Sequence, residues 1–260
     1  MDAEIYLDNK SFIHRLDPRT KIIVFLLTFV AILLFEDPVW MLPVGFLILF
    51  QLLVSRSFKN LRRIRYILIV LTVSSMVLWN FFSQGVTPLF WVFEVESFLF
   101  AIARTFLMVF MISTGMILIS TTRNEELVLG MIRLGMPYRV GFAISTALRL
   151  VPTIASSTMT ISQAQRSRGL DLDSGNLLDR IKKFLPLLVP VFISTIRNTN
   201  IFAMALESKG FGARDQRTFY LNLQMRKADY YILIFAVVFT VASIVLSIMG
   251  YGKIIGLTRF

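Results

Sequence analysis

Residues 230–249 read YYILIFAVVFTVASIVLSIM, without a single charged side chain. A helix that crosses the hydrocarbon core of a bilayer needs about 20 consecutive apolar residues, which this stretch supplies. The rest of the chain is of the same kind, because 56% of its residues are hydrophobic and its mean hydropathy is +0.71. In soluble domains about a quarter of the residues are charged, whereas here the share is 17%. The sequence therefore predicts an integral membrane protein.

Other apolar segments precede this one and divide the chain. The Asp17-Pro18 pair before the first of them is typical of a helix start. We predict an all-α, polytopic membrane protein with about five transmembrane helices and a cytoplasmic set of long coupling helices. Residues 1–121 would hold four transmembrane helices, 122–229 the cytoplasmic or membrane-interface region, and 230–260 the last transmembrane helix and the tail. The four earlier segments are Lys21–Phe35, Val39–Val54, Tyr66–Phe82 and Phe98–Thr121.

The distribution of Lys and Arg predicts the orientation. Segments 1–21 and 55–65 contain nine of them, whereas 36–37 and 83–97 contain none. Region 122–229 contains 15 of the 27 in the chain. The positive-inside rule then places the N-terminus, 55–65 and 122–229 in the cytoplasm, which explains the net charge of +11 without nucleic acid. With five spans the C-terminal tail lies outside; with a sixth over 184–206 it lies inside.

Few residues are available for catalysis or for binding metals. The chain has no Cys, and His14 is its only histidine, so neither a zinc site nor a Ser–His pair is expected. Apart from Lys21, which begins the first segment, Arg104 is the only charge inside the five predicted spans. An intramembrane charge is a functional candidate, but the place of Arg104 near the start of the fourth span favours extension to the outer interface.

The region between 122 and 229 is predicted to be helical throughout. Thr122, with Glu125 three residues later, has the spacing of a capping box. A long helix over Tyr138–Arg168 and another over Leu177–Lys209 follow, interrupted only by prolines. Each has a stretch of small and polar residues, at 155–167 and at 194–205. Because small residues allow two helix backbones to approach closely, we predict a crossed pair.

A short repeat ends both long helices: 164–170 reads AQRSRGL and 205–211 reads ALESKGF. One interpretation is structural, because Gly after a helix, with a cation in its last turn, is a common helix end. The other is that each helix presents a cation to a groove on a partner protein. Two such ends would suit a partner that is itself a two-fold or pseudo-two-fold pair.

With this repeat, the sequence resembles the transmembrane T component of energy-coupling factor transporters, the family that includes the cobalt-transport permease subunit. The resemblance covers nearly the whole chain. In that family the paired motif is Ala-Arg-Gly or a close variant. Here Ser167 and Ser208 replace Ala, and Lys209 replaces Arg. The residues that carry the resemblance are His14–Lys21, Ser120–Thr122, Glu125–Leu127, Leu134–Pro137, Ala147–Pro152, and the two motifs Ser167-Arg168-Gly169 and Ser208-Lys209-Gly210.

The resemblance implies a coupling subunit of a modular ABC importer in a prokaryotic plasma membrane. Its expected partners are the lipid bilayer, two cytoplasmic ABC ATPases and a small membrane protein, the S component, that binds a vitamin or metal ion. The two motifs would dock one on each ATPase. The ATPases form a hetero- or a homodimer, and the Arg168/Lys209 difference favours two different proteins. No cofactor is implied.

Two other classes of function stay open from the residues. A membrane-embedded enzyme needs clustered carboxylates, and the chain offers only Glu36-Asp37, Glu125-Glu126 and the pair Asp171 and Asp173. Solvation explains the last pair better than Mg²⁺ binding. A stand-alone channel or carrier would transport by itself. No G-x-x-x-x-G-K-[S/T] motif occurs, so any ATP hydrolysis is expected from other subunits.

Overall fold

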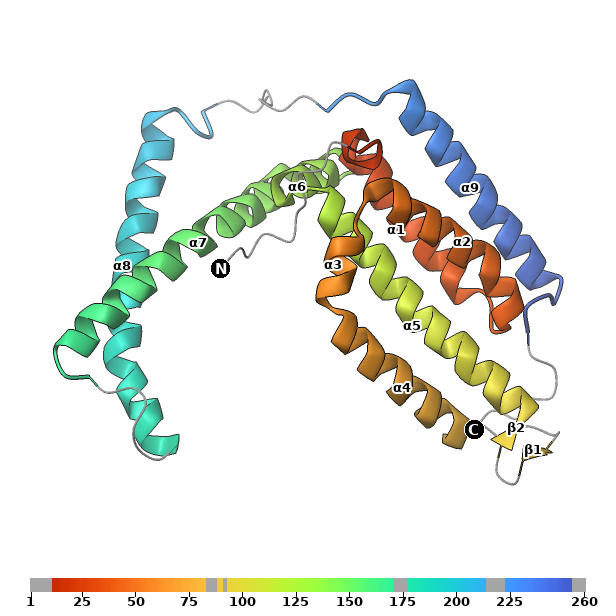
Figure 1. The fold of residues 1–260 in the computed structure, drawn as a ribbon. Coiled ribbons are helices and arrows are strands. Elements are labelled where there is room, and N and C mark those ends of the chain that lie inside the picture. The colour runs from red at the N-terminus through yellow and green to blue at the C-terminus, as the bar shows by residue number, and fades with distance from the viewer. Residues whose placement is uncertain (1–10, 83–87, 91–92, 171–176, 214–222, 254–260) are drawn as a thin grey trace. The chain divides into compact units, whose positions relative to one another are not determined.

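The computed structural model describes residues 11–82, 88–90, 93–170, 177–213 and 223–253. The chain divides into two compact units, residues 1–136 with 223–260 (unit 1) and residues 137–222 (unit 2). The elements, labelled in Figure 1, are η1 Ile13–Arg15, α1 Pro18–Leu33, α2 Pro38–Ser55, α3 Phe58–Arg63, α4 Arg65–Phe82, β1 Pro88–Phe90, β2 Phe93–Glu94, α5 Val95–Thr121, α6 Asn124–Arg133, α7 Tyr138–Ser167, α8 Leu177–Ser208 and α9 Lys227–Ile248.

The predicted class, an all-α polytopic membrane protein, is confirmed. Six helices in the described part of the chain are long and apolar enough to cross a membrane, namely α2, α4, α5, α7, α9 and Lys183–Ser208 of α8. This number is close to the predicted five, but the members differ. Helix α1 has only 16 residues, slightly fewer than a span usually needs. Helices α7 and α8, predicted to be cytoplasmic, also have the length and composition of a span.

Two local features differ from the sequence prediction. Strands β1 and β2 pair antiparallel between α4 and α5, where no element was predicted. The predicted capping box at Thr122 is wrong, because α6 begins after Arg123 and the side chain of this N-cap residue does not cap the helix. Thr122 is instead buried before the helix. Acidic residues still occupy the first turn of α6, where they complement the helix dipole.

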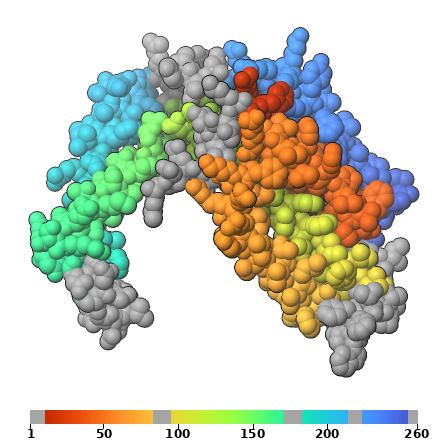
Figure 2. Space-filling view, viewed as in Figure 1, coloured from red at the N-terminus to blue at the C-terminus, as the bar shows by residue number. Residues whose placement is uncertain are grey.

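The core of unit 1 lies between α1, α2 and α5. Its apolar members are buried, and hydroxyl-bearing residues such as Ser113 and Thr114 lie among them, each donating to the carbonyl four residues earlier. Small hydroxyl residues are typical of helix contacts in membranes. Side chains of the helices before α5 (red to orange in Figure 2) cover much of α5 on this face. The core residues are Ala31, Ile32, Phe35, Met41, Val44, Ile48, Leu52, Ala103 and Ile117.

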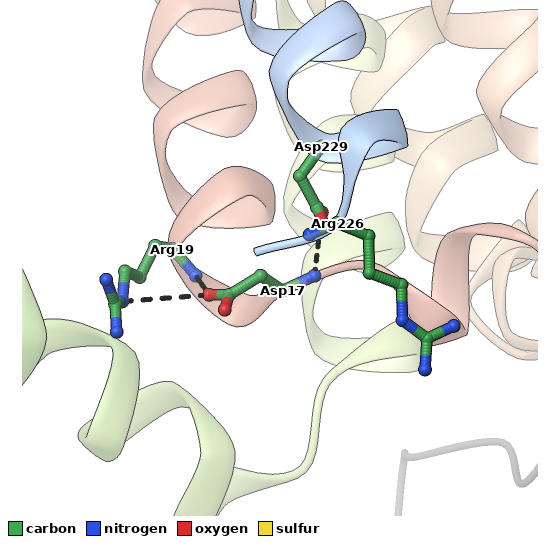
Figure 3. A network of polar contacts seen from close by, with 4 residues as sticks. All are labelled: Asp17, Arg19, Arg226 and Asp229. Carbon is green, nitrogen blue, oxygen red and sulfur yellow. Dashed lines mark hydrogen bonds and ion pairs between the residues drawn. The ribbon is translucent and has the colours of Figure 1, made fainter. Parts of the chain in front are cut away.

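Buried polar contacts join the starts of α1 and α9 (Figure 3). Asp17 caps α1 as predicted, its Oδ1 accepting from Arg19 N at 2.9 Å. Asp229 of α9 is 1% exposed. Its Oδ1 accepts from Asp17 N at 2.9 Å and its Oδ2 from Arg226 N at 2.8 Å. One carboxylate therefore satisfies backbone N–H groups at the starts of two helices, and the carboxylate itself lies 212 residues after Asp17.

The end of α5 meets the same cluster through Lys21. Its Nζ donates to the carbonyl of Thr121 at 2.8 Å and to that of His14 at 3.1 Å. At the other end of unit 1, the carbonyl of Gly252 accepts from Glu36 N and Asp37 N. The start of α1, the end of α5 and the start of α9 thus share one side of unit 1. The tail begins on the opposite side, at the turn between α1 and α2.

Candidate functional site

The first predicted motif ends α7 in a defined backbone conformation. The helix ends at Ser167, Arg168 is the C-cap, and Gly169 has φ +89°. Gly169 N donates to Arg166 O and Leu170 N to Gln165 O, both at 3.0 Å. This pair of bonds is a Schellman motif, and it needs a residue that tolerates positive φ after the C-cap. The side chain of Arg168 is exposed at the end of the helix.

The second motif ends α8 in the same way. Gly210 has φ +72°, its N–H donates to Glu207 O at 2.8 Å, and Phe211 N donates to Leu206 O at 2.9 Å. Lys209 is therefore the structural counterpart of Arg168, and it is also exposed. Both serines use their hydroxyl locally: Ser167 Oγ donates to Gln163 O and Ser208 Oγ to Ala205 O. The six predicted motif residues form two matching helix ends.

Unit 1 contains two helix ends of the same type without a cation at the C-cap. Helix α6 ends with Leu134 before Gly135, and α9 with Met249 before Gly250. Met136 N donates to Met131 O, and Tyr251 N to Leu246 O. Since an apolar residue serves at the C-cap in both, the Schellman geometry does not explain the cations of unit 2. The conformation accounts for the glycines of the motifs and does not by itself select a cation at the C-cap.

Helices α7 and α8 contact each other as an antiparallel pair and cross in Figure 1. Near the start of α7, the Phe142 ring lies 4.4 Å from that of Phe211, just past the end of α8. Towards the end of α7, Gln165 Nε2 donates to Pro186 O, near the start of α8. The two motifs therefore lie at opposite ends of the pair. Twenty-three residues separate Phe142 from Gln165, which is roughly 35 Å of helix.

The predicted small-residue stretches do not form the contact throughout. Ser156, Thr160 and Thr199 are exposed, and each hydroxyl donates to a carbonyl of its own helix. The helices pair as predicted, but these three small residues remain exposed and are not covered by the other helix of the pair. Close approach of another helix at these positions is sterically allowed.

Much apolar surface of unit 2 is exposed. Of the described residues in α7 and α8, only Gly141 is buried. On α7 the exposed apolar residues recur every three or four positions, which places them on one face of the helix. Such a stripe is typical of a surface that lipid or another protein covers. The stripe of α7 consists of Val140, Ile144, Leu148 and Val151, and α8 exposes Leu185, Leu188, Val189, Phe192, Ile193 and Ile196.

Arg104, near the start of α5, contacts two aromatic rings; that its side chain extends to the outer interface stays a prediction. Its guanidinium carbon is 4.7 Å from the centroid of the Phe100 ring and 5.6 Å from that of Trp79. Its Nε is buried and has no hydrogen-bond partner among the described residues. The side chain therefore stacks on aromatic rings between α4 and α5, a contact that stabilises a cation in an apolar setting.

The acidic pairs considered for catalysis have structural surroundings where the structure describes them. Asp37 caps α2 by accepting from Val39 N at 2.9 Å. Glu125 and Glu126 lie in the first turn of α6. Asp171 and Asp173 lie outside the described residues. Within the described part of the chain, no group of three or more His, Cys, Asp or Glu side chains is placed to hold a metal ion.

Together these features define a polytopic α-helical membrane protein that presents a helical hairpin with a cation at each end. Residues 9–220 match the CbiQ family, described as "Cobalt transport protein". The chain is 34% identical to the energy-coupling factor transporter transmembrane protein EcfT of Clostridium kluyveri, over 95% of this chain and 97% of that protein. It is 30% identical to EcfT of Lactococcus lactis subsp. cremoris, over 93% and 96%. The chain therefore belongs to the CbiQ/EcfT family of transmembrane components of energy-coupling factor transporters.

Proposed function

We propose that this chain transmits ATP-driven motion from two cytoplasmic ABC ATPases to a separate substrate-binding membrane subunit, the S component, for uptake of a vitamin or a metal ion. In this proposal Arg168 and Lys209 are the two ATPase contacts. The observation that carries it is the pair of matching helix ends, each with an exposed cation that its cap does not need, at opposite ends of one hairpin.

The separation of the motifs supports two contacts instead of one. Roughly 35 Å between the ends of the pair is too far for both cations to enter one groove. Two ATPase subunits, each receiving one motif, would match this spacing. A rotation of either subunit would then move one end of a rigid helix pair and displace the other parts of unit 2.

The apolar stripes of α7 and α8 are the proposed surface for the S component. Their side chains are more than a third exposed, and apolar surface of this extent favours association with another apolar surface. The N-terminus, residues 55–65 and the motifs are proposed to face the cytoplasm. This orientation is supported by unit 1, in which residues 17, 121 and 229 lie on the same side.

Co-purification tests the proposal. The tagged chain is expressed in a prokaryotic host that carries its own transporter genes, extracted in mild detergent, and its partners are identified by mass spectrometry. We expect one or two ABC ATPases with the wild type and a large loss with Arg168→Glu or Lys209→Glu, because an acid replaces each docking cation. Arg197→Glu is the matched control, since Arg197 is exposed on α8 away from both ends.

Each outcome has a distinct meaning. Equal recovery from wild type, both motif variants and the control would reduce the motifs to helix caps. No ATPase from the wild type would contradict the coupling function, and flux through liposomes that contain this chain alone would then favour a stand-alone carrier.

A further inference from the structure

Helix α3 lies between two candidate membrane spans. Helix α2 ends at Ser55 and α4 begins at Arg65, and both are long and apolar enough to cross a bilayer. The six residues of α3 extend over about 9 Å. The polar headgroup layer is roughly 5–7 Å deep on each side of the hydrocarbon core. A connection this short therefore stays close to the lipid headgroups when α2 and α4 cross the bilayer.

This connection is strongly basic. Residues 56–65 contain five Lys or Arg, and the whole range 38–93 contains no Asp or Glu. Lys59, Arg62 and Arg63 are three or four positions apart, which places them on one face of α3, and all three are exposed. Among the described residues, no carboxylate forms an ion pair with any of them. Because like charges at this spacing repel, these three residues, the basic face of α3, favour binding of an anion.

The opposite face of α3 is fixed to the rest of unit 1, beside α5 (Figure 1). Ser57 and Asn60 are 0% and 4% exposed. Asn60 Nδ2 donates to Ser120 Oγ at 2.8 Å, near the end of α5, and Leu61 packs against the apolar core. Because these contacts hold one side of α3 against unit 1, the basic face stays turned towards the surroundings of the helix.

Exposed apolar surface adjoins the basic face. Phe58 of α3 is 42% exposed, and in α4, which follows, only Ser75 is buried. At the start of α4, Arg65 Nη2 donates to Tyr66 Oη at 3.0 Å, and Tyr66 is 68% exposed. Exposed aromatic rings of this kind are typical of the membrane–water interface. An anionic phospholipid has negative charge directly next to hydrocarbon and so matches both parts of this surface, whereas an acidic protein surface matches the charge alone.

We propose that the basic face of α3 binds the phosphate group of an anionic phospholipid, whose acyl chains lie along the exposed apolar side chains of α4. Hydrogen bonds between these cations and phosphate oxygens are charge-assisted and therefore strong. The bound lipid would hold α3, and through Asn60 the end of α5, at the level of the headgroups. The positive-inside rule concerns how many cations a loop contains, whereas here three of them share one face of a fixed helix. The proposal is independent of ATPase coupling.

Lipid binding by the full chain tests the site. The purified chain in mild detergent is titrated with phosphatidylglycerol and phosphatidylcholine of identical acyl chains, and native mass spectrometry measures the binding of each. We expect the wild type to bind phosphatidylglycerol about tenfold more tightly, since each cation near an anionic headgroup strengthens binding. The triple variant Lys59→Gln, Arg62→Gln and Arg63→Gln should lower this preference about fivefold. In the wild type the preference should also fall at high salt, because the cations are exposed.

The matched control changes three other exposed cations to Gln, namely Arg139, Arg197 and Lys253. It lowers the net charge equally, so its lipid preference should stay near that of the wild type. Arg62→Gln alone should lower the preference about twofold, which keeps the site testable if the triple variant does not fold. An unchanged preference in the α3 variants, or an equal loss in the control, would overturn the proposal. Loss of ATPase from the triple variant with an unchanged lipid preference would also overturn it, because the basic face would then be a protein contact.

Discussion

Units 1 and 2 use their apolar side chains in different ways. Unit 1 has a buried apolar core between α1, α2 and α5, and backbone N–H groups at its helix starts find buried acceptors such as Asp229. Unit 2 consists mainly of two long helices in which Gly141 is the only described residue that is buried. Unit 1 therefore has the contacts of a folded membrane domain, whereas unit 2 leaves its surface for other molecules.

The difference indicates where stability and function reside. In unit 1 a substitution removes a contact inside the chain, so its effect should appear as lost stability. In unit 2 almost all described side chains keep exposed surface, so substitutions there should act mainly on association. The predictions below test this division, beginning with the largest expected effect.

The largest effect is expected for Asp229→Ala. This change leaves the buried N–H of Asp17 and that of Arg226 without their acceptor. Each buried donor that loses a partner costs about 1–3 kcal/mol, so the free energy of unfolding should fall by about 3 kcal/mol. Thermal unfolding in detergent measures the change, followed by tryptophan fluorescence, because Trp40 and Trp79 both belong to unit 1.

Asp229→Asn is the control for this prediction. It keeps one acceptor oxygen and places an amide NH₂ opposite the other backbone N–H, so an intermediate loss is expected. ATPase recovery from the folded fraction of either variant should stay near that of the wild type. A melting temperature unchanged by Asp229→Ala would show that the contacts between α1 and α9 do not stabilise unit 1.

A smaller effect is expected for Gly169→Ala, compared with Gly250→Ala. Both glycines have φ +89°, and an added Cβ meets nothing within 4 Å at either, so both changes impose the same backbone strain of about 1–2 kcal/mol. Gly169→Ala strains the helix end that presents Arg168, so we expect less ATPase to co-purify with this variant. At Gly250 the strained end carries Met249, and recovery should not change. Equal loss of ATPase in both variants would contradict a specific role for the α7 end.

The helices that form the candidate site could be predicted from the sequence alone. Local signals set both ends of α7: Pro137 before its start and Gly169 after its end. The predicted helices over Tyr138–Arg168 and Leu177–Lys209 agree with α7 and α8 to within one residue at each end. These boundaries follow from backbone rules that act over a few residues, which a single sequence contains.

The arrangement of the site could not be predicted in the same way. That the motifs lie at opposite ends depends on Phe142 meeting Phe211, and that α1 begins beside α9 depends on Asp229 meeting Asp17. These residues are far apart in the chain, and one sequence does not show which distant residues pair. The same limit explains the error at Thr122, where burial against unit 1 neighbours outweighs the local capping pattern.

The smallest effect is expected for Lys209→Arg, which makes the two ends of the hairpin alike. A guanidinium can bind a carboxylate through two parallel hydrogen bonds, whereas an ammonium acts as a point charge. If Lys209 docks on an ATPase carboxylate, the change should tighten that contact by about 0.5–1 kcal/mol, a roughly two- to fivefold lower Kd. Titration of the purified chain with its ATPases measures the Kd. Arg168→Lys should weaken binding by a similar factor, and two variants with the wild-type Kd would show that neither cation makes a bidentate contact.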